Sequence, residues 1–236
     1  MINVAVNNNL FSCLISTCKQ TDKMKNQVCD LTVESVLGLL QSQKSKCCYC
    51  GHVLDIEKGD KKLSQVSIDR SDSNLGHTIE NSVLSCLFCG LGKNATNVDW
   101  FRDFISVIKS DQYDAMITKY QDEKKDVNIV ANLRSRAWHS DNDNRDPGDK
   151  IQVISVNEIR ELAREQNNVC AITGIPFINT KLDKFPFKMS LDRIDNTGTH
   201  TKDNCQLVCL AIQYGRNDKS IQEVKDYIDE IRANTT

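Results

Sequence analysis

Apolar residues recur at helical spacing in four segments of the chain. In 31–43 (LTVESVLGLLQSQ) and 154–166 (ISVNEIRELAREQ), apolar positions three and four residues apart follow a Thr or Ser that can cap a helix N-terminus. The segments 97–110 and 220–233 are amphipathic in the same way. The pattern predicts four helices, which fall into two similar pairs.

The two pairs of helices belong to an internal repeat. A constant offset of 123 residues superposes 47–94 on 170–217 without a gap, and about one third of these positions are identical. Both copies contain Ser-x-Asp-Arg … His-Thr … Asn … Leu-x-Cys, as VSIDRSDSNLGHTIENSVLSC at 66–86 and MSLDRIDNTGTHTKDNCQLVC at 189–209. Each copy predicts a helix, a Cys-containing turn, a hairpin with a loop, a short helix and a closing helix. We therefore expect two domains of one α+β fold.

The segment 111–150 separates the two copies. It contains DEKKD and HSDNDNRDPGDK, which are charged and rich in turn-forming residues, as is typical of a linker or surface loop. We expect a first unit over 1–125 and a second over 126–236, joined by this charged linker.

Composition narrows the classes of function. A net charge of −2 does not produce the field of a protein that coats nucleic acid non-specifically, so a contact with DNA or RNA has to come from local basic patches. The N-terminal residues lack a basic region followed by a long apolar core, and no run is long enough to span a membrane. We expect a cytosolic, nuclear or virion-internal protein that is not secreted and has no membrane partner.

The cysteines predict one zinc site, in the first unit. There are eleven of them, an odd number without a secretion signal, which favours reduced thiols and metal ligands over disulfides. Cys47-x-x-Cys50 and Cys86-x-x-Cys89 supply the two pairs of thiolates that a closed, structural Zn²⁺ site requires. Cys48 is an alternative ligand, but superposition aligns Cys47 with a cysteine of the second copy.

The second copy lacks the complete ligand set. Its corresponding residues are Cys170, Thr173, Cys209 and Ile212. Threonine and isoleucine cannot hold zinc, so apolar packing has to replace the folding free energy of the metal, and IPF (175–177) and FPF (185–187) supply apolar side chains for this. We expect the remaining cysteines of this unit, Cys170, Cys205 and Cys209, in the core.

Two cysteine pairs around an Asp-containing hairpin, followed by an Asn and a basic residue, resemble the HNH (ββα-metal) endonuclease family. The second copy, QNNVCAITGIPF … MSLDRIDNTGTHTKDNCQLVC, is similar to the phage and large-virus type of HNH protein. The resemblance implies a tandem, degenerate duplication of a treble-clef-like ββα-metal unit, of which the first is stapled by zinc. In that family a hairpin and a helix hold one divalent cation, and the activity is phosphodiester cleavage.

The resemblance implies a role for each matching residue. The Asp that binds the catalytic cation matches Asp69 and Asp192, and the Asn that braces the loop matches Asn81 and Asn204. The second metal ligand of the family matches Gly90 in the first copy and Gln213 in the second. The second unit therefore retains the better site for a cation such as Mg²⁺, with an amide oxygen as a weak ligand.

The general base of the family is replaced in both copies. The position of its His is taken by Arg70 and Arg193, and arginine stays protonated at physiological pH, so it can clamp a phosphate but cannot accept a proton. Lys93 and Arg216 keep the basic residue that follows the last metal ligand. We expect Lys93, Arg193 and Arg216 to contact nucleic acid.

Three further features each have two interpretations. His77 and His200 lie eight residues beyond the Asp and are either substitute general bases or braces of their loops. The Asp-Arg-x-Asp units supply active-site carboxylates, or hold an Arg between two carboxylates. NLRSRAWHS (132–140) is either a patch that grips phosphate and stacks on bases, or a helix anchored by its Trp.

Two functions from different classes follow. The first is a nucleic-acid-directed HNH-type protein, either a degenerate metal-dependent endonuclease or a descendant that only binds DNA or RNA. Its predicted catalytic residues are Asp192, Arg193, His200, Asn204 and Gln213. The alternative is a non-enzymatic structural or interaction component of a viral particle or large ribonucleoprotein, with protein assembly partners. Net acidity and the missing base favour the alternative, whereas the recurrence of Asp, Arg, His and Asn favours the first.

Overall fold

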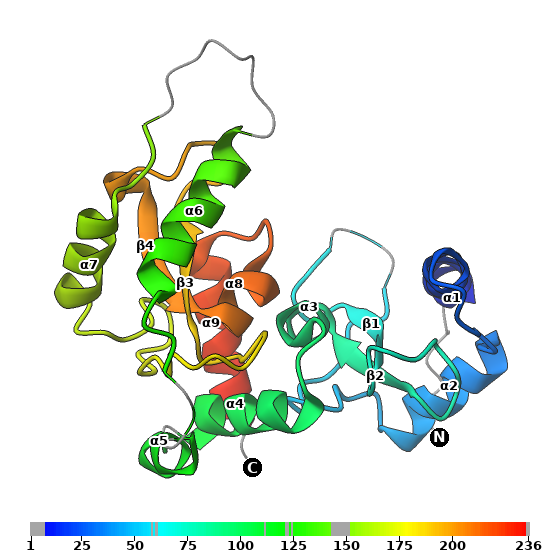
Figure 1. Ribbon diagram of the computed structural model, residues 1–236. Helices are drawn as coiled ribbons and strands as arrows, with labels where there is room; N and C mark the ends of the chain where they lie inside the picture. Colours follow the sequence, from blue (N-terminus) through cyan, green and yellow to red (C-terminus); the bar gives the residue numbers. More distant parts are fainter. Residues whose placement is uncertain are drawn as a thin grey trace.

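The protein has a mixed α+β fold with two small antiparallel sheets (Figure 1). A computed structural model describes residues 8–57, 59, 61–110, 112–120, 123, 125–142 and 152–234. The first half contains α1 (Asn8–Met24), α2 (Val33–Ser42), β1 (Val66–Arg70), β2 (Ser82–Cys86), α3 (Leu87–Lys93), α4 (Val98–Ser110) and α5 (Asp114–Tyr120). The second half contains α6 (Ile129–Asn142), α7 (Val156–Glu165), β3 (Met189–Arg193), η1 (Lys202–Asn204), β4 (Cys205–Cys209), α8 (Leu210–Arg216) and α9 (Ile221–Ala233).

The repeat in the sequence is repeated in the structure. Helices α2, α3 and α4 have the same lengths as α7, α8 and α9, and the offset between them is that of the sequence repeat. The hairpins share one register, with Asp69 opposite Val83 in the first and Asp192 opposite Gln206 in the second. The predicted succession of helix, Cys-containing turn, hairpin, short helix and closing helix is confirmed.

Capping side chains start the first helix of each copy at the expected residue. The Thr32 hydroxyl accepts a hydrogen bond from the Ser35 N–H at 3.1 Å, and the Ser155 hydroxyl accepts one from the Glu158 N–H at 3.2 Å. Both are capping boxes, because the side chain three residues on bonds back to the backbone N–H of the cap.

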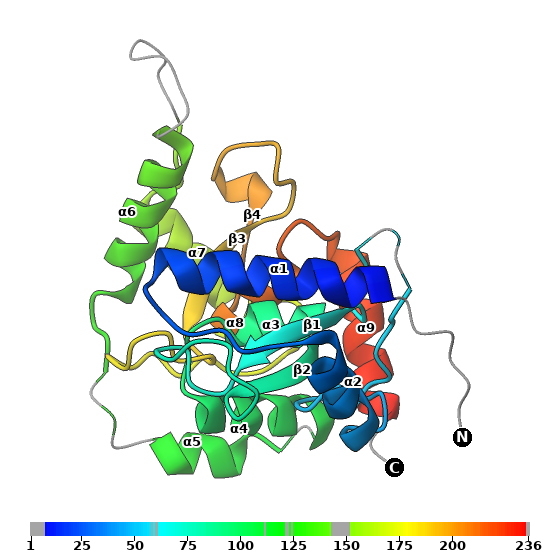
Figure 2. The ribbon, with the colours of Figure 1, turned by 90° about the vertical axis from the view of Figure 1, so that its right-hand side faces the viewer.

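The segment between the copies is helical where the sequence predicted a linker or loop. It contains α5 and α6, while residues 111, 121, 122, 124 and 143–150 of the expected linker lie outside the described part of the chain. Helix α6 forms because Leu133 and Ala137 are buried against α7 and β3, a tertiary contact that the charged sequence does not reveal. Helix α1 packs against α2 and β1 in the same manner (Figure 2). The division at residue 125 stays a prediction.

The two halves pack through α3 and α8, which face each other in the centre of the molecule (Figure 1). Glycines permit the close approach of the helices: a Cβ on Gly92 would lie 2.9 Å from the Ala211 carbonyl oxygen, and one on Gly215 would lie 2.8 Å from the Phe88 ring. One apolar core therefore runs through both halves.

The closing helices each reach the opposite half. Phe104 on α4 packs edge to face on Phe187 of the second half, with ring centroids 5.1 Å apart. Tyr227 on α9 packs in the same way on Phe88 of the first half, at 5.6 Å. This exchange joins the halves into one hydrophobic unit.

The second half fills its core with the apolar side chains that were expected there. Ile175, Phe185 and Phe187 are fully buried, and so are Cys170 and Cys209 beside them. Cys205 is buried as well. Among the described residues, no helix combines the length and apolar character needed to cross a bilayer.

Candidate metal centre and hairpin sites

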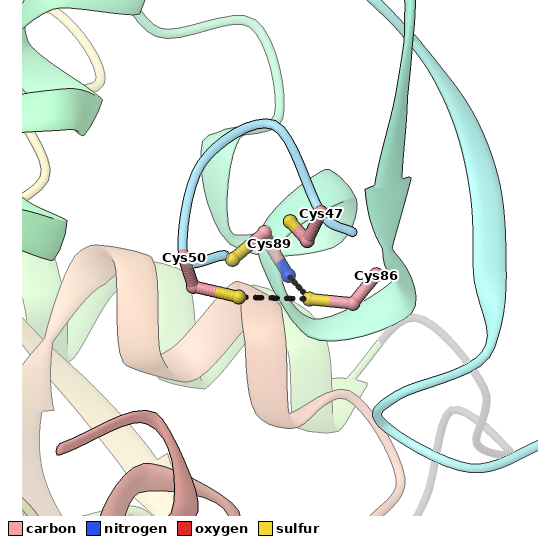
Figure 3. Close-up of side chains that lie close together, drawn as sticks. All are labelled: Cys47, Cys50, Cys86 and Cys89. Atoms are coloured by element: carbon pink, nitrogen blue, oxygen red, sulfur yellow. Dashed lines mark hydrogen bonds between the residues drawn. The ribbon is translucent and has the colours of Figure 1, made fainter. Parts of the chain in front are cut away.

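The structure brings four cysteines of the first half into one buried cluster (Figure 3). The sulfur atoms of Cys47, Cys50, Cys86 and Cys89 all lie within 4.8 Å of one another. A tetrahedral zinc ion with Zn–S bonds of about 2.3 Å separates its sulfur atoms by about 3.8 Å. The Cys50 and Cys86 sulfurs are 3.8 Å apart. This group can hold a metal ion such as zinc, and its four-sulfur shell is of the closed, structural kind.

Local backbone geometry positions both cysteine pairs. Gly51 has a φ of +76°, which closes the turn so that the Cys47 N–H donates to the His52 carbonyl oxygen at 2.8 Å. The second pair begins α3, where the Cys89 N–H donates to the Cys86 sulfur at 3.4 Å. Cys48 is exposed and Cys47 is buried, so the structure assigns the cluster to Cys47.

The thiols of this cluster differ in acidity. Burial raises the pKa of Cys86 and Cys89 well above the ordinary value. Burial acts in the same direction on Cys47, but hydrogen bonds from the neighbouring thiols outweigh it and lower the Cys47 pKa. Because a metal binds thiolates, loading the full set requires proton release, and metal affinity should fall with decreasing pH.

In the second half, the hairpin aspartate is bound to an arginine. Asp192 is 4% exposed, and its Oδ1 lies 2.8 Å from Nη1 of Arg216, which is 2% exposed. The Gln206 amide donates to the other carboxylate oxygen at 2.9 Å. Burial raises the Asp192 pKa, while Gln206 and Arg216 oppose the shift. The carboxylate that a cation would need is thus occupied by a side chain of the protein itself.

The first half repeats this arrangement with a lysine. The Lys93 ammonium is fully buried and lies 3.3 Å from Asp69 Oδ2, and the same oxygen accepts a hydrogen bond from the Tyr49 hydroxyl at 2.6 Å. The ammonium also donates to the Arg70 carbonyl oxygen at 2.8 Å, as Arg216 does to that of Arg193 at 2.8 Å. Lys93 and Arg216, expected to contact nucleic acid, are buried within the hairpins instead.

The expected oxygen ligand of the second half is also engaged. The Gln213 amide oxygen accepts a hydrogen bond from the Ser190 hydroxyl, and its amide nitrogen donates to the Leu191 carbonyl oxygen at 2.8 Å. At the equivalent position of the first half, a Cβ on Gly90 would lie 2.9 Å from the Ser85 hydroxyl oxygen. Among the described residues, the four cysteines are the only group of three or more His, Cys, Asp or Glu side chains that can hold a metal, so the Mg²⁺ site finds no support.

Each loop histidine is held by a buried aspartate from the helix that precedes the copy. The Asp141 carboxylate on α6 accepts hydrogen bonds from both the backbone N–H and Nδ1 of His200, each at 2.7 Å. Asp22 on α1 binds His77 in the same way, at 2.6 Å and 2.9 Å. These bonds brace both loops, and they engage Nδ1 and not Nε2, so the role of a general base stays a prediction. Sequence reasoning missed both aspartates, because the offset between them is 119 residues and they lie outside the aligned segments.

The Arg of the second Asp-Arg-x-Asp unit is not held between the two carboxylates of that unit. Arg193 donates to the Gly198 carbonyl oxygen at 3.0 Å and lies 4.0 Å from Asp141, so its nearest carboxylate comes from α6. Asn204 donates to the carbonyl oxygens of Asp195 and Thr199, both at 2.9 Å. The predicted hydrogen bonding of the Asn across the loop is confirmed, here and at Asn81 of the first half.

Four of the five predicted catalytic residues border one cavity of about 370 Å³. Asp192, Arg193, His200 and Gln213 line it, together with Ser140 at the end of α6 and with residues of the first half. Asn204 lies outside the lining and braces the loop. The cavity is thus formed where the two halves meet.

The basic and aromatic residues of 132–140 lie on the exposed side of α6. Arg134 and Trp138 are one helical turn apart and both are exposed, Trp138 by 39%. Leu133, Ala137 and Asp141 form the buried side, so the Trp is not the anchor of this helix.

Comparison with known proteins finds one viral relative. The chain is 26% identical over 183 residues to "Uncharacterized protein R423" of Acanthamoeba polyphaga mimivirus, and the match covers 77% of this chain. It covers 30% of the length of that protein. No family model matches the chain. No solved structure matches it.

Proposed function

We propose that the protein is a zinc-stapled tandem of HNH-like units that binds nucleic acid and has lost metal-dependent cleavage. The observation that carries this proposal is a buried basic side chain bound to the aspartate of each hairpin, which we call the internal cation. A positive side chain lies on each aspartate, Arg216 on Asp192 and Lys93 on Asp69, where an HNH enzyme would hold its divalent cation.

Two requirements of metal-dependent hydrolysis are unmet: a carboxylate that is free for the cation, and a general base at the position of the family's His. A divalent cation would have to displace a buried, charge-paired guanidinium or ammonium, and that would leave a positive charge without its partner in the interior. Arg193 cannot replace the missing base, because it stays protonated. His200 is bonded to Asp141 through Nδ1, so that only its Nε2 could accept a proton. The hairpin is therefore retained as a scaffold.

Nucleic-acid binding is supported by exposed basic and aromatic side chains of the second half. Arg134 and Trp138 on α6 offer a cation for a phosphate and an aromatic face for a base. Arg193, whose side chain is 28% exposed, lines the cavity between the halves and has further N–H donors beside the one that bonds the loop. On a protein of net charge −2, binding has to rely on such local cations.

The test combines a binding assay with a cleavage assay. Fluorescence anisotropy with labelled duplex DNA, single-stranded DNA and RNA should give binding at 50 mM salt that weakens steeply by 200 mM. Arg134→Gln and Trp138→Ala should each weaken it, whereas the control Arg102→Gln, which removes an exposed cation of α4, should not. Plasmid DNA should remain uncut with Mg²⁺, Mn²⁺ or Ni²⁺.

Two results would contradict the proposal in different ways. Cleavage that Asp192→Ala abolishes would show that a divalent cation does displace Arg216. Absence of binding to all three probes at low salt would favour a structural or interaction component of a larger viral assembly.

A further inference from the structure

We infer that Tyr227 completes the metal centre of the first half by donating a hydrogen bond from its hydroxyl group to the Cys86 thiolate. Tyr227 lies on α9, in the second half, so the centre would be built from both halves of the chain. The inference rests on the proposed zinc site and is independent of nucleic-acid binding.

The position of Tyr227 is the first argument. Its ring packs on Phe88, between the two cysteines of the second pair, with centroids 5.6 Å apart, and on His52, just after the first pair, at 5.0 Å. His52 Nε2 in turn lies 3.0 Å from Glu230 Oε2, one helical turn further along α9. The Tyr227 ring thus packs beside both cysteine pairs of the cluster.

The hydroxyl group is the second argument. Tyr227 is 5% exposed, and its hydroxyl oxygen is buried without a hydrogen-bond partner of normal geometry among the described residues. The ring contact with Phe88, two residues after Cys86, keeps this side chain at the second cysteine pair, and burial together with the neighbouring Cys86 and Cys50 raises the Tyr227 pKa. A buried O–H without an acceptor costs about 1–3 kcal/mol, so its retention calls for an acceptor.

The charge of a loaded centre supplies that acceptor. Four thiolates around Zn²⁺ carry a net negative charge, and burying it requires donors aimed at the sulfur atoms. The Cys89 N–H already donates to the Cys86 sulfur at 3.4 Å. The Tyr227 hydroxyl would be a second donor to the same thiolate, in the way that outer-shell groups orient and tune metal ligands.

The internal repeat provides a comparison within the protein. The residue of α4 that corresponds to Tyr227 is Phe104, which packs on Phe187 in the half that lacks the four-cysteine cluster. The hydroxyl group is thus present at the position that packs on Phe88 beside the cluster, and absent from the equivalent position that packs on Phe187.

The experiment measures metal affinity in the full chain. Zinc competition with a chromophoric chelator should show that Tyr227→Phe, which removes only the hydroxyl, weakens zinc binding about tenfold or more. The control is Tyr120→Phe, since the Tyr120 hydroxyl is bound to Asp103 at 2.7 Å and its ring packs on Phe185 of the second half. This control should bind zinc as the wild type does.

A spectroscopic measurement separates a hydrogen bond from a change in stability. In ¹¹³Cd-substituted protein, Tyr227→Phe should shift the cadmium NMR resonance, because the electron density on the bound sulfur changes, and Tyr120→Phe should leave it in place. Equal zinc affinities and equal cadmium shifts for Tyr227→Phe and wild type would overturn the inference alone. A wild type that takes up no zinc would overturn the proposed centre and the inference with it.

Discussion

Replacing Arg216 by Met tests whether the internal cation neutralises the hairpin aspartate. In the native protein Arg216 is 2% exposed and Asp192 is 4% exposed, so both charges are removed from water. The substitution leaves Asp192 with the Gln206 amide, at 2.9 Å, as its remaining donor. A buried carboxylate that loses its ionic partner typically costs about 3–5 kcal/mol of folding free energy.

Further lost hydrogen bonds place the expected cost toward the upper part of that range. Arg216 also donates to the carbonyl oxygens of Arg193, at 2.8 Å, and Ile194, at 3.1 Å. Each lost bond to a charged donor contributes about 1.5–3 kcal/mol in isolation, although loop relaxation and water recover part of it. We therefore expect a loss of about 4–5 kcal/mol from the free energy of unfolding.

The assay is urea unfolding followed by circular dichroism and by tryptophan fluorescence. Coincidence of the two curves has to be checked first, because two packed halves need not unfold in one step. The control is Arg164→Met on the exposed side of α7, which should change the free energy by less than about 0.5 kcal/mol. The double variant Asp192→Asn with Arg216→Met should be more stable than the sum of the single effects predicts, by about 0.5–3 kcal/mol.

Two outcomes would refute this reasoning. A loss below about 1 kcal/mol for Arg216→Met would mean that water or another cation reaches Asp192. Additive effects in the double variant would mean that the two side chains are not an energetic pair. The argument that a divalent cation cannot displace Arg216 from Asp192 would then fail.

Three further predictions concern the cysteines, the loop brace and the carboxyl groups. Cys86→Ser should abolish zinc uptake and unfold the first half, whereas Cys209→Ser should cost only about 1–3 kcal/mol as a core substitution, as metal analysis and circular dichroism can measure. Asp141→Asn should destabilise the protein by about 1.5–3 kcal/mol in urea, because it weakens two bonds from the loop histidine, and an unchanged midpoint would argue against a brace. In a carboxyl NMR titration, Asp195 should titrate below the ordinary pKa of 3.8 and Asp192 above it. Hydrogen bonds from the Thr197 N–H and hydroxyl lower the Asp195 pKa, and burial raises the Asp192 pKa. Asp195 thus stabilises the fold above its unfolded pKa, and this contribution is lost as the pH falls through its folded pKa. Asp192, whose pKa is raised on folding, instead stabilises the fold toward low pH. Titration of Asp192 below Asp195 would contradict these two pKa directions.

Local patterns in the sequence determined most of the secondary structure. The first helix of each copy begins at a capping side chain, Thr32 or Ser155, and continues at apolar spacing, so contacts within a few residues specify it. Cysteine spacing also identified the four residues that cluster as a candidate metal centre, because each pair lies in a turn whose own backbone bonds set its geometry. The alignment of the copies also selected Cys47 over Cys48 as the ligand, because Cys47 aligns with Cys170.

Only the tertiary structure decided what the hairpin sites contain. Arg216 reaches Asp192 across 24 residues, Asp141 reaches His200 across 59, and Tyr227 contacts Phe88 from the other half of the chain. Helix α6 likewise exists because it is buried against α7 and β3, and its charged sequence resembles a linker. A charge or hydroxyl group that is buried away from water needs a hydrogen-bonding or ionic partner. That partner comes from whichever segment packs beside it, and the periodicity of the sequence does not indicate which segment this is.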